Sequence, residues 1–219
     1  MLSESPAIGR LIPAAASAAE IWGEDPGIAL HPAERVLVQD VGARRLRTFT
    51  TARTCARRAL AALGHPPAPI LRGPSGEPLW PNGIIGSITH CDGYSAAVVA
   101  RAGTVPALGI DAEPHRPLTE GLLPMIATRA ERDRLARLPD GMHWDRLVFC
   151  VKEAVYKAWF PLTGQWLDFH EADVTIDPAE RTFTARLLVP GPRGITGFAG
   201  AFTVAGEVVI AAVRDIRFG

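Results

Sequence analysis

Two segments of the chain have the pattern of a β-hairpin, and no other feature restricts the fold as strongly. In GSITHCDGYSAAVVA (residues 86–100), two strand-like runs flank Asp92-Gly93, a dipeptide that favours a two-residue turn. The segment GAFTVAGEVVIAAV (residues 200–213) has the same form, with Gly206 at the turn. One hairpin lies in each half of the chain, so the sequence predicts antiparallel strands in two similar halves.

Helical spacing of apolar side chains predicts one long helix in each half. Apolar residues recur at three- and four-residue steps within residues 33–63, and Gly64 ends this run. The clearest apolar stripe follows MHWDRLVFCVKEAVYKAWF (residues 142–160), and Pro161 is expected to end that helix. Residues 72–83 are rich in turn formers and are predicted to be a loop.

The remaining C-terminal residues, from 172 onward, alternate between apolar and polar as antiparallel strands do. Helices and antiparallel strands together predict an α+β fold. We expect it to divide into an N-terminal half, residues 1–105, and a C-terminal half, residues 106–219.

Composition argues against several classes of protein. The formal net charge is zero, whereas domains that bind nucleic acid are strongly basic. No apolar run approaches the roughly 20 residues of a membrane-spanning helix, and LIPAAASAAE lacks the basic leader of a signal peptide. The three cysteines form no CxxC pair, which argues for reduced thiols and against structural zinc. We expect a cytoplasmic protein without a membrane or nucleic-acid partner.

A pair of acids, Asp111 and Glu113, follows a short apolar run in GIDAEP (residues 109–114). In a strand these two side chains point to the same side and repel each other. A magnesium ion would relieve the repulsion, because it prefers carboxylate oxygens and shares itself with substrate phosphates. Glu153 is the candidate for a third acid. Two alternatives stay open: a solvated acid pair, and a Glu153–Lys157 helix pair that stabilises by only about 0.2–0.5 kcal/mol.

Basic residues gather in ARRLRTFTTARTCARRAL (residues 43–60), which carries six arginines and no acid. The guanidinium fork matches phosphate oxygens, so this stretch is a candidate phosphate site, although a solvated helix face would have the same composition. His90 is open to two interpretations as well. It would donate a hydrogen bond to a phosphate if it faced one, and it would otherwise be an ordinary strand histidine.

Three motifs in this order carry a resemblance to a known family: SITH (87–90), GIDAE (109–113) and FCVKEAVYKAW (149–159). Together they resemble the signature of the 4'-phosphopantetheinyl transferases of the surfactin-synthetase-activating superfamily, in the enterobactin-type and actinobacterial branch. Such enzymes transfer the phosphopantetheine arm of coenzyme A to a serine of an apo acyl or peptidyl carrier protein, and adenosine 3',5'-bisphosphate is released. The resemblance implies a role in fatty acid, polyketide or nonribosomal peptide biosynthesis.

The resemblance also implies an architecture. The family fold has two similar α/β halves related by a pseudo-two-fold, each with an antiparallel sheet packed on a long helix. The active site lies in the cleft between the halves. One chain then supplies both sides of the cleft, so a monomer is sufficient.

Site residues follow from the same resemblance. The metal ligands map onto Asp111, Glu113 and Glu153, with the backbone carbonyl of Ala112, and they imply Mg2+ with Mn2+ as the alternative ion. Glu153, Lys157 and Asp111 are the expected catalytic residues, with Glu153 as the base, directly or through a metal-bound water, and Lys157 balancing the leaving group. Ser75 stands where some relatives carry a lysine. Contacts with coenzyme A map onto Arg45, Arg53, Arg72, Gly73, Pro74, Ser75, Thr89, His90, Asp111, Glu153 and Lys157.

Other functions use the same residues. A magnesium-dependent nucleotide hydrolase or nucleotidyl transferase would turn over coenzyme A or nucleotides without a carrier protein, and a non-catalytic coenzyme A-binding module would form no product. Residues 116–138 mix apolar side chains, including Met125 and Ile126, with four arginines between residues 129 and 137. They predict a surface for acidic carrier proteins, or equally a partly buried amphipathic helix. Lys152 is turned about 100° from Glu153 around a helix.

Overall fold

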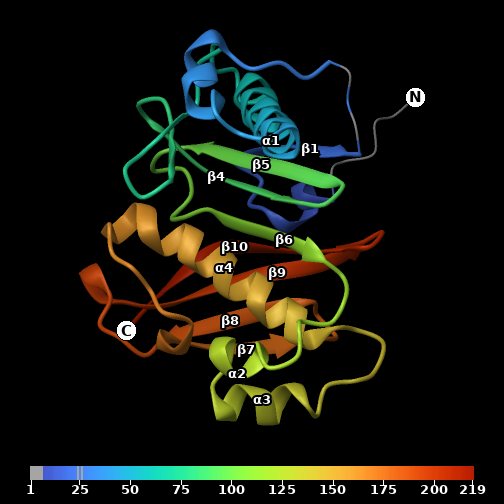
Figure 1. The fold of residues 1–219 in the computed structure, drawn as a ribbon. Coiled ribbons are helices and arrows are strands. Elements are labelled where there is room, and N and C mark those ends of the chain that lie inside the picture. The colour runs from blue at the N-terminus through green and yellow to red at the C-terminus, as the bar shows by residue number, and fades with distance from the viewer. Residues whose placement is uncertain (1–6, 24, 26) are drawn as a thin grey trace. The chain divides into compact units, whose positions relative to one another are not determined.

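The chain folds into two units, Met1–Val105 and Pro106–Gly219, each with an antiparallel sheet and a long helix packed against it (Figure 1). The computed structural model describes residues 7–23, 25 and 27–219. The predicted α+β class is confirmed. Within the described residues, no helix has both the length and the apolar character needed to cross a membrane.

The sheet of the first unit has the strand order β1-β5-β4. Strand β1 (Ala16–Trp22) pairs with β5 (Tyr94–Arg101), which also pairs with β4 (Ile84–Cys91). The connection between β4 and β5 is Asp92-Gly93, with Gly93 in the left-handed region at a φ of 74°, so the predicted hairpin is confirmed. A short 3-10 helix, η1 (Ile8–Leu11), precedes β1.

Helix α1 (Ala43–Ala62) covers this sheet through a stripe of small apolar side chains. Cys55, Ala56 and Leu60 are buried and pack in one core with Ile21 of β1 and Val99 of β5. The small side chains allow the helix to approach the strands closely. The apolar spacing in the sequence therefore identified the buried face of α1 correctly.

The prediction of one helix over residues 33–63 was wrong at its N-terminal end. Residues Pro32–Val38 form a separate 3-10 helix, η2, and α1 begins only after Gly42, which has an extended backbone. The predicted loop over residues 72–83 contains two strands of two residues each, β2 (Leu71–Arg72) and β3 (Pro78–Leu79), which pair with each other. The rest of that segment is turn.

The second unit contains five antiparallel strands in the order β6-β10-β9-β8-β7. The expected alternating strands after residue 172 are present, and the hairpin between β9 and β10 turns at Gly206-Glu207 as predicted. The strands of the second unit are β6 (Gly109–Pro114), β7 (Ala172–Asp177), β8 (Thr182–Leu187), β9 (Ile195–Ala205) and β10 (Val208–Phe218).

Helix α4 (Trp144–Thr163) crosses the sheet next to β6 and β10 (Figure 1). Gly109 is essential to this packing, because a Cβ built there would lie 2.1 Å from the carbonyl oxygen of Ala154. Pro161 does not end the helix as predicted; it lies in the last turn, and Gly164 ends the helix with a φ of 64°. Burial of Ala158 and Trp159 just before the proline outweighs the one backbone hydrogen bond that proline cannot make.

Residues 116–138 form short elements instead of one amphipathic helix. They contain α2 (Leu123–Ile126) and α3 (Arg129–Leu135), and two further 3-10 helices follow α4, η3 (Phe169–Glu171) and η4 (Pro192–Gly194). Met125 is 67% exposed, whereas Ile126 is only 5% exposed and belongs to the core. Ile126 is therefore a structural residue and is removed from the predicted docking surface.

Candidate active site

The acid pair of the second unit meets a lysine of α4. Asp111 lies in β6, opposite Ala211 of β10, and is buried. The Nζ atom of Lys157 donates a hydrogen bond of 2.6 Å to Oδ1 of Asp111. The Lys157 side chain remains 29% exposed, so the ion pair lies at the edge of the core. This contact joins the GIDAE motif to the helix motif, which are 46 residues apart in sequence.

One face of α4 carries three charged residues opposite the acids of β6. Arg146, Glu153 and Lys157 are separated by seven and four residues, which places them on the same side of the helix. The Nη1 atom of Arg146 donates a hydrogen bond of 3.0 Å to Oε2 of Glu113. Arg146 was not among the residues predicted from the sequence, although its two-turn spacing from Glu153 was the signal that could have found it.

Burial and the charge of Asp111 raise the pKa of the other two acids, Glu113 and Glu153. Burial raises the pKa of Glu113, and the charge of Asp111 raises it further against the opposing effect of Arg146. Burial also raises the pKa of Glu153, again with Asp111 adding to the shift and Lys157 opposing it. The charge of Asp111 therefore acts on both Glu113 and Glu153.

Lys157 is held in its charged form. Burial by itself lowers the pKa of a lysine, but the charge of Asp111, its hydrogen bond and the charge of Glu153 outweigh burial, so the pKa of Lys157 is raised. The amine donates to Asp111, so the simple Glu153–Lys157 helix pair does not account for the arrangement. The result is a fixed ammonium group beside two carboxylates.

The carboxylate oxygens of Asp111, Glu113 and Glu153 are of the type that binds a hard divalent cation. Carboxylate oxygens are the ligands that Mg2+ prefers, and a cation would relieve the repulsion that raises the pKa values of Glu113 and Glu153. In the part of the chain that the structure describes, however, no three histidine, cysteine, aspartate or glutamate side chains are gathered closely enough to bind a metal ion. Lys157 and Arg146 hold Asp111 and Glu113, so a metal has to compete with both.

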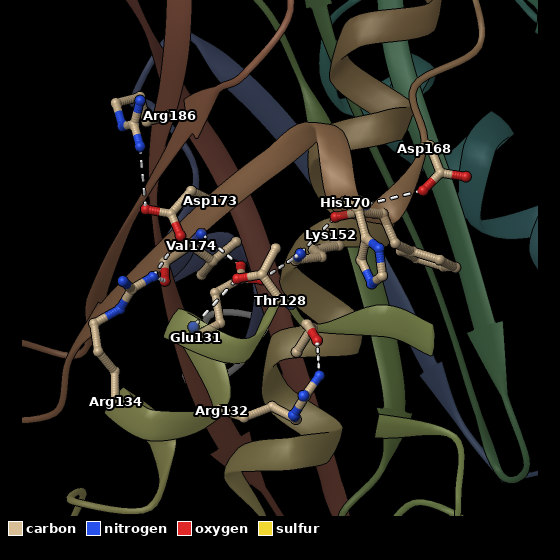
Figure 2. A network of polar contacts seen from close by, with 12 residues as sticks. Thr128, Glu131, Arg132, Arg134, Lys152, Asp168, His170, Asp173, Val174 and Arg186 are labelled. Carbon is tan, nitrogen blue, oxygen red and sulfur yellow. Dashed lines mark hydrogen bonds and ion pairs between the residues drawn. The ribbon is translucent and has the colours of Figure 1, made fainter. Parts of the chain in front are cut away.

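Lys152 serves a different set of groups from its neighbour Glu153. Its side chain is 2% exposed, and its Nζ atom donates to Oε2 of Glu131 at 2.9 Å and to the carbonyl oxygen of Phe169 at 2.5 Å. Figure 2 shows Glu131 between Thr128, Lys152 and Val174. The sequence contained a signal for Glu131, because Thr128-x-x-Glu131 is a capping box at the start of α3.

The first unit contains the remaining candidates for coenzyme A contacts. Arg45 is exposed on α1, whereas Arg53 is only 7% exposed on the same helix and its guanidinium lies 4.4 Å from the ring centre of Phe49. In β4, Thr89 is buried and the next residue, His90, is exposed, as alternation along a strand requires. No described contact tests whether these residues bind a ligand, and that role stays a prediction.

The turn after β2 holds the other four candidates, Arg72–Ser75. The N–H group of Ser75 donates to Oε2 of Glu77 at 2.9 Å, and the N–H group of Gly73 donates to the backbone carbonyl of Glu77 at 2.8 Å. Arg72, Pro74 and Ser75 are exposed. The turn is therefore held by its own hydrogen bonds and presents one arginine and one hydroxyl group to the outside.

An acid cluster with a charged lysine in one unit, and an arginine-rich helix in the other, are typical of enzymes that act on phosphorylated substrates with a divalent cation. Comparison with known proteins identifies the family. Residues 33–100 match the 4'-phosphopantetheinyl transferase N-terminal domain, and residues 107–211 match the 4'-phosphopantetheinyl transferase superfamily. The chain belongs to the 4'-phosphopantetheinyl transferase superfamily, as the resemblance of its motifs predicted.

Similar proteins extend over most of the chain. It is 50% identical to the 4'-phosphopantetheinyl transferase Svp of Streptomyces mobaraensis over 87% of this chain and 80% of that protein. It is 45% identical to PptT of Mycobacterium tuberculosis, over 89% and 90% of the two chains, and 43% identical to Npt of Nocardia iowensis, over 94% and 98%. Both of these relatives are also named as 4'-phosphopantetheinyl transferases.

Proposed function

We propose that this protein transfers the 4'-phosphopantetheine arm of coenzyme A to a serine of an apo acyl or peptidyl carrier protein and releases adenosine 3',5'-bisphosphate. It is a transferase by its family, whose sequence pattern covers both units. The observation that carries the assignment of the site is the 2.6 Å contact between Lys157 and Asp111. That contact places a fixed positive charge beside the acids of the GIDAE motif, where a diphosphate needs neutralisation.

The proposed metal ligands are Asp111, Glu113 and Glu153, with the backbone carbonyl of Ala112. They would hold Mg2+, or Mn2+ as the alternative, and the bound ion would neutralise the diphosphate of coenzyme A and polarise its phosphorus. The support for this assignment is the carboxylate donor set, in which burial and the charge of Asp111 raise the pKa of Glu113 and Glu153.

Two side chains of α4 have proposed roles in the chemistry. Glu153 accepts the proton of the carrier serine, directly or through a metal-bound water. Lys157 keeps its proton because of Asp111 and balances the charge that develops on the leaving bisphosphate. Asp111 thus has a second role, which is to keep the ammonium group charged and in position.

The proposed contacts with coenzyme A follow from the family resemblance, and each unit offers some of the residues. The first unit offers Arg45, Arg53, the turn Arg72–Ser75, Thr89 and His90, and the second offers Asp111, Glu153 and Lys157. One chain supplies the whole set, so a monomer suffices. The exposed side chains of Met125 and Leu122, close in sequence to the arginines of α3, are the proposed docking surface for an acidic carrier protein.

Mass spectrometry of an apo carrier protein, incubated with coenzyme A and magnesium, tests this function. The carrier should gain about 340 Da, the mass of the covalent arm. Asp111→Ala should abolish the gain while the protein stays folded, and EDTA should abolish it reversibly. Release of nucleotide product without any carrier would instead indicate a hydrolase, and binding without product would indicate a binding module.

A further inference from the structure

The first unit contains a buried acid that the transfer chemistry does not use. Glu34 of η2 is 0% exposed. Its Oε2 atom accepts hydrogen bonds from Nη1 of Arg57 at 2.5 Å and from the N–H group of His31 at 3.0 Å, and its Oε1 atom accepts one from the N–H group of Ile70 at 2.9 Å. Burying a carboxylate costs several kcal/mol unless it is fully paired, so these donors have to stay in place.

Arg57, the partner of Glu34, is fixed in turn. Its Nη2 atom also donates to the backbone carbonyl of Ala29 and to Oγ1 of Thr54. The guanidinium group therefore connects α1, η2 and the segment before η2. Glu34 lies at a fixed point relative to α1 and holds Ile70 there.

Ile70 is held from its other backbone group as well. The Nε atom of Arg53, one helical turn before Arg57, donates a hydrogen bond of 2.8 Å to the carbonyl oxygen of Ile70. The side chain of Ile70 is fully buried in the core of the first unit. Ile70 is thus fixed by two charged side chains and by its own burial, immediately before β2.

The segment that follows Ile70 is the β2–β3 hairpin, in which Arg72 ends β2 and Gly73, Pro74 and Ser75 come next in the turn. The hairpin is only two residue pairs long, Leu71 with Leu79 and Arg72 with Pro78. Any shift at Ile70 therefore carries the whole turn with it. Glu34 controls that position from a buried site.

We propose that Glu34 is a positioning residue for coenzyme A: through Arg57 and the N–H group of Ile70, it sets the place of the Arg72–Ser75 turn. The inference rests on the proposed function, because it assumes that this turn contacts coenzyme A. Glu34→Gln keeps the shape but removes the charge, and it turns an N–H donor toward Arg57, His31 or Ile70, which are donors themselves. Ile70, at the start of the hairpin, is then held less firmly.

Steady-state kinetics with the full chain tests the proposal. Glu34→Gln should raise the KM for coenzyme A about tenfold, because small misplacements of a binding group have effects of this size or larger. The kcat and the KM for the apo carrier should stay within about twofold. Asp25→Asn is the matched control: it removes the acid partner of Arg58, an α1 ion pair of 2.8 Å that does not involve Ile70, and should change neither KM.

Hydrogen exchange without any ligand gives an independent readout. Peptides covering residues 70–79 should exchange faster in Glu34→Gln than in the wild type or in Asp25→Asn. An unchanged KM for coenzyme A in Glu34→Gln overturns the proposal, whether or not exchange changes. Equal rises in both KM values also overturn it, because they indicate a general folding defect.

A second variant keeps the test valid if Glu34→Gln does not fold. Arg57→Gln leaves Glu34 with its backbone donors alone and should give the same selective rise in the KM for coenzyme A, and no selective rise in folded Arg57→Gln overturns the proposal. The wild type separates this inference from the proposed function. Failure of the wild type to modify any apo carrier rejects the function, whereas normal transfer with an unchanged variant rejects only the role of Glu34.

Discussion

The two units use the same arrangement of charged side chains to hold one backbone residue each. In the first unit, Ile70 donates its N–H to Glu34 and accepts from Arg53. In the second unit, Val174 donates its N–H to Glu131 at 2.7 Å and accepts from Arg134 at 2.9 Å. Both glutamates are buried and occupy the third position of a capping box.

The basic partners continue the comparison. Glu34 pairs with Arg57 of α1, and Glu131 pairs with Lys152 of α4, so each acid is tied to the long helix of its own unit. The difference lies in what is held. Val174 belongs to β7 and is paired with Ala185 of β8, whereas Ile70 precedes a two-pair hairpin. The same device therefore supports a sheet in one unit and positions an exposed turn in the other.

The largest expected effect distinguishes a residue of α4 that acts in catalysis from one that stabilises the fold. Glu153→Gln should lower kcat by about 10²- to 10⁴-fold, the usual contribution of a general base. The free energy of unfolding should stay unchanged or rise, because burial and Asp111 destabilise the Glu153 carboxylate. Carrier modification assays and urea unfolding measure the two quantities. Glu180→Gln, on an exposed turn, is the control, and full activity of purified Glu153→Gln would reject the assignment of the base.

Glu131, the partner of the adjacent Lys152, should behave in the opposite way: its replacement should lower stability and leave activity of the folded protein unchanged. Glu131→Gln leaves the Lys152 ammonium buried without its charge partner, which should lower the free energy of unfolding by about 3–5 kcal/mol. Replacing both residues, as in Glu131→Gln with Lys152→Met, should recover part of that loss. Urea unfolding of the single and double variants measures the difference. A selective rise in the KM for coenzyme A in Glu131→Gln would contradict the distinction between Glu34, which positions an exposed turn, and Glu131, which supports a sheet.

The expected effect that is smallest near neutral pH concerns the buried thiols, of which each long helix has one. Cys55 of α1 donates to the carbonyl of Ser95, and Cys150 of α4 donates to the carbonyl of Val209. Burial raises the pKa of Cys55 from 9.0 to about 12. Above pH 9 the unfolded chain loses this proton while the folded chain keeps it, so stability falls with rising pH by up to about 1.4 kcal/mol per unit.

Comparison of Cys55→Ala with the wild type isolates this contribution. The variant should lack that part of the alkaline loss between about pH 9 and 12, as measured by urea unfolding at several pH values. Cys91→Ala, at the half-buried end of β4, should keep the wild-type slope. Identical slopes for the wild type and Cys55→Ala would show that the Cys55 thiol ionises equally easily in the folded chain.

The sequence by itself determined the local elements and singled out the acids of the proposed site. Asp92-Gly93 and Gly206 specified their hairpins, and helical spacing specified the buried faces of α1 and α4, because turn geometry and apolar periodicity depend on neighbouring residues. The acids of GIDAE and Glu153 stood out for the same reason: charges in apolar surroundings need a partner. The tertiary structure then showed that Lys157 takes Asp111 as its partner.

Only the tertiary structure decided which distant groups satisfy one another. Arg146 with Glu113, Lys152 with Glu131, and Glu34 with Ile70 are separated by 33, 21 and 36 residues, and no local pattern specifies such pairs. Tertiary packing also overrode two local signals, the continuous helical pattern before Gly42 and the helix-breaking tendency of Pro161. The physical reason is that the burial of whole helix faces stabilises more than a single backbone hydrogen bond or a local propensity costs.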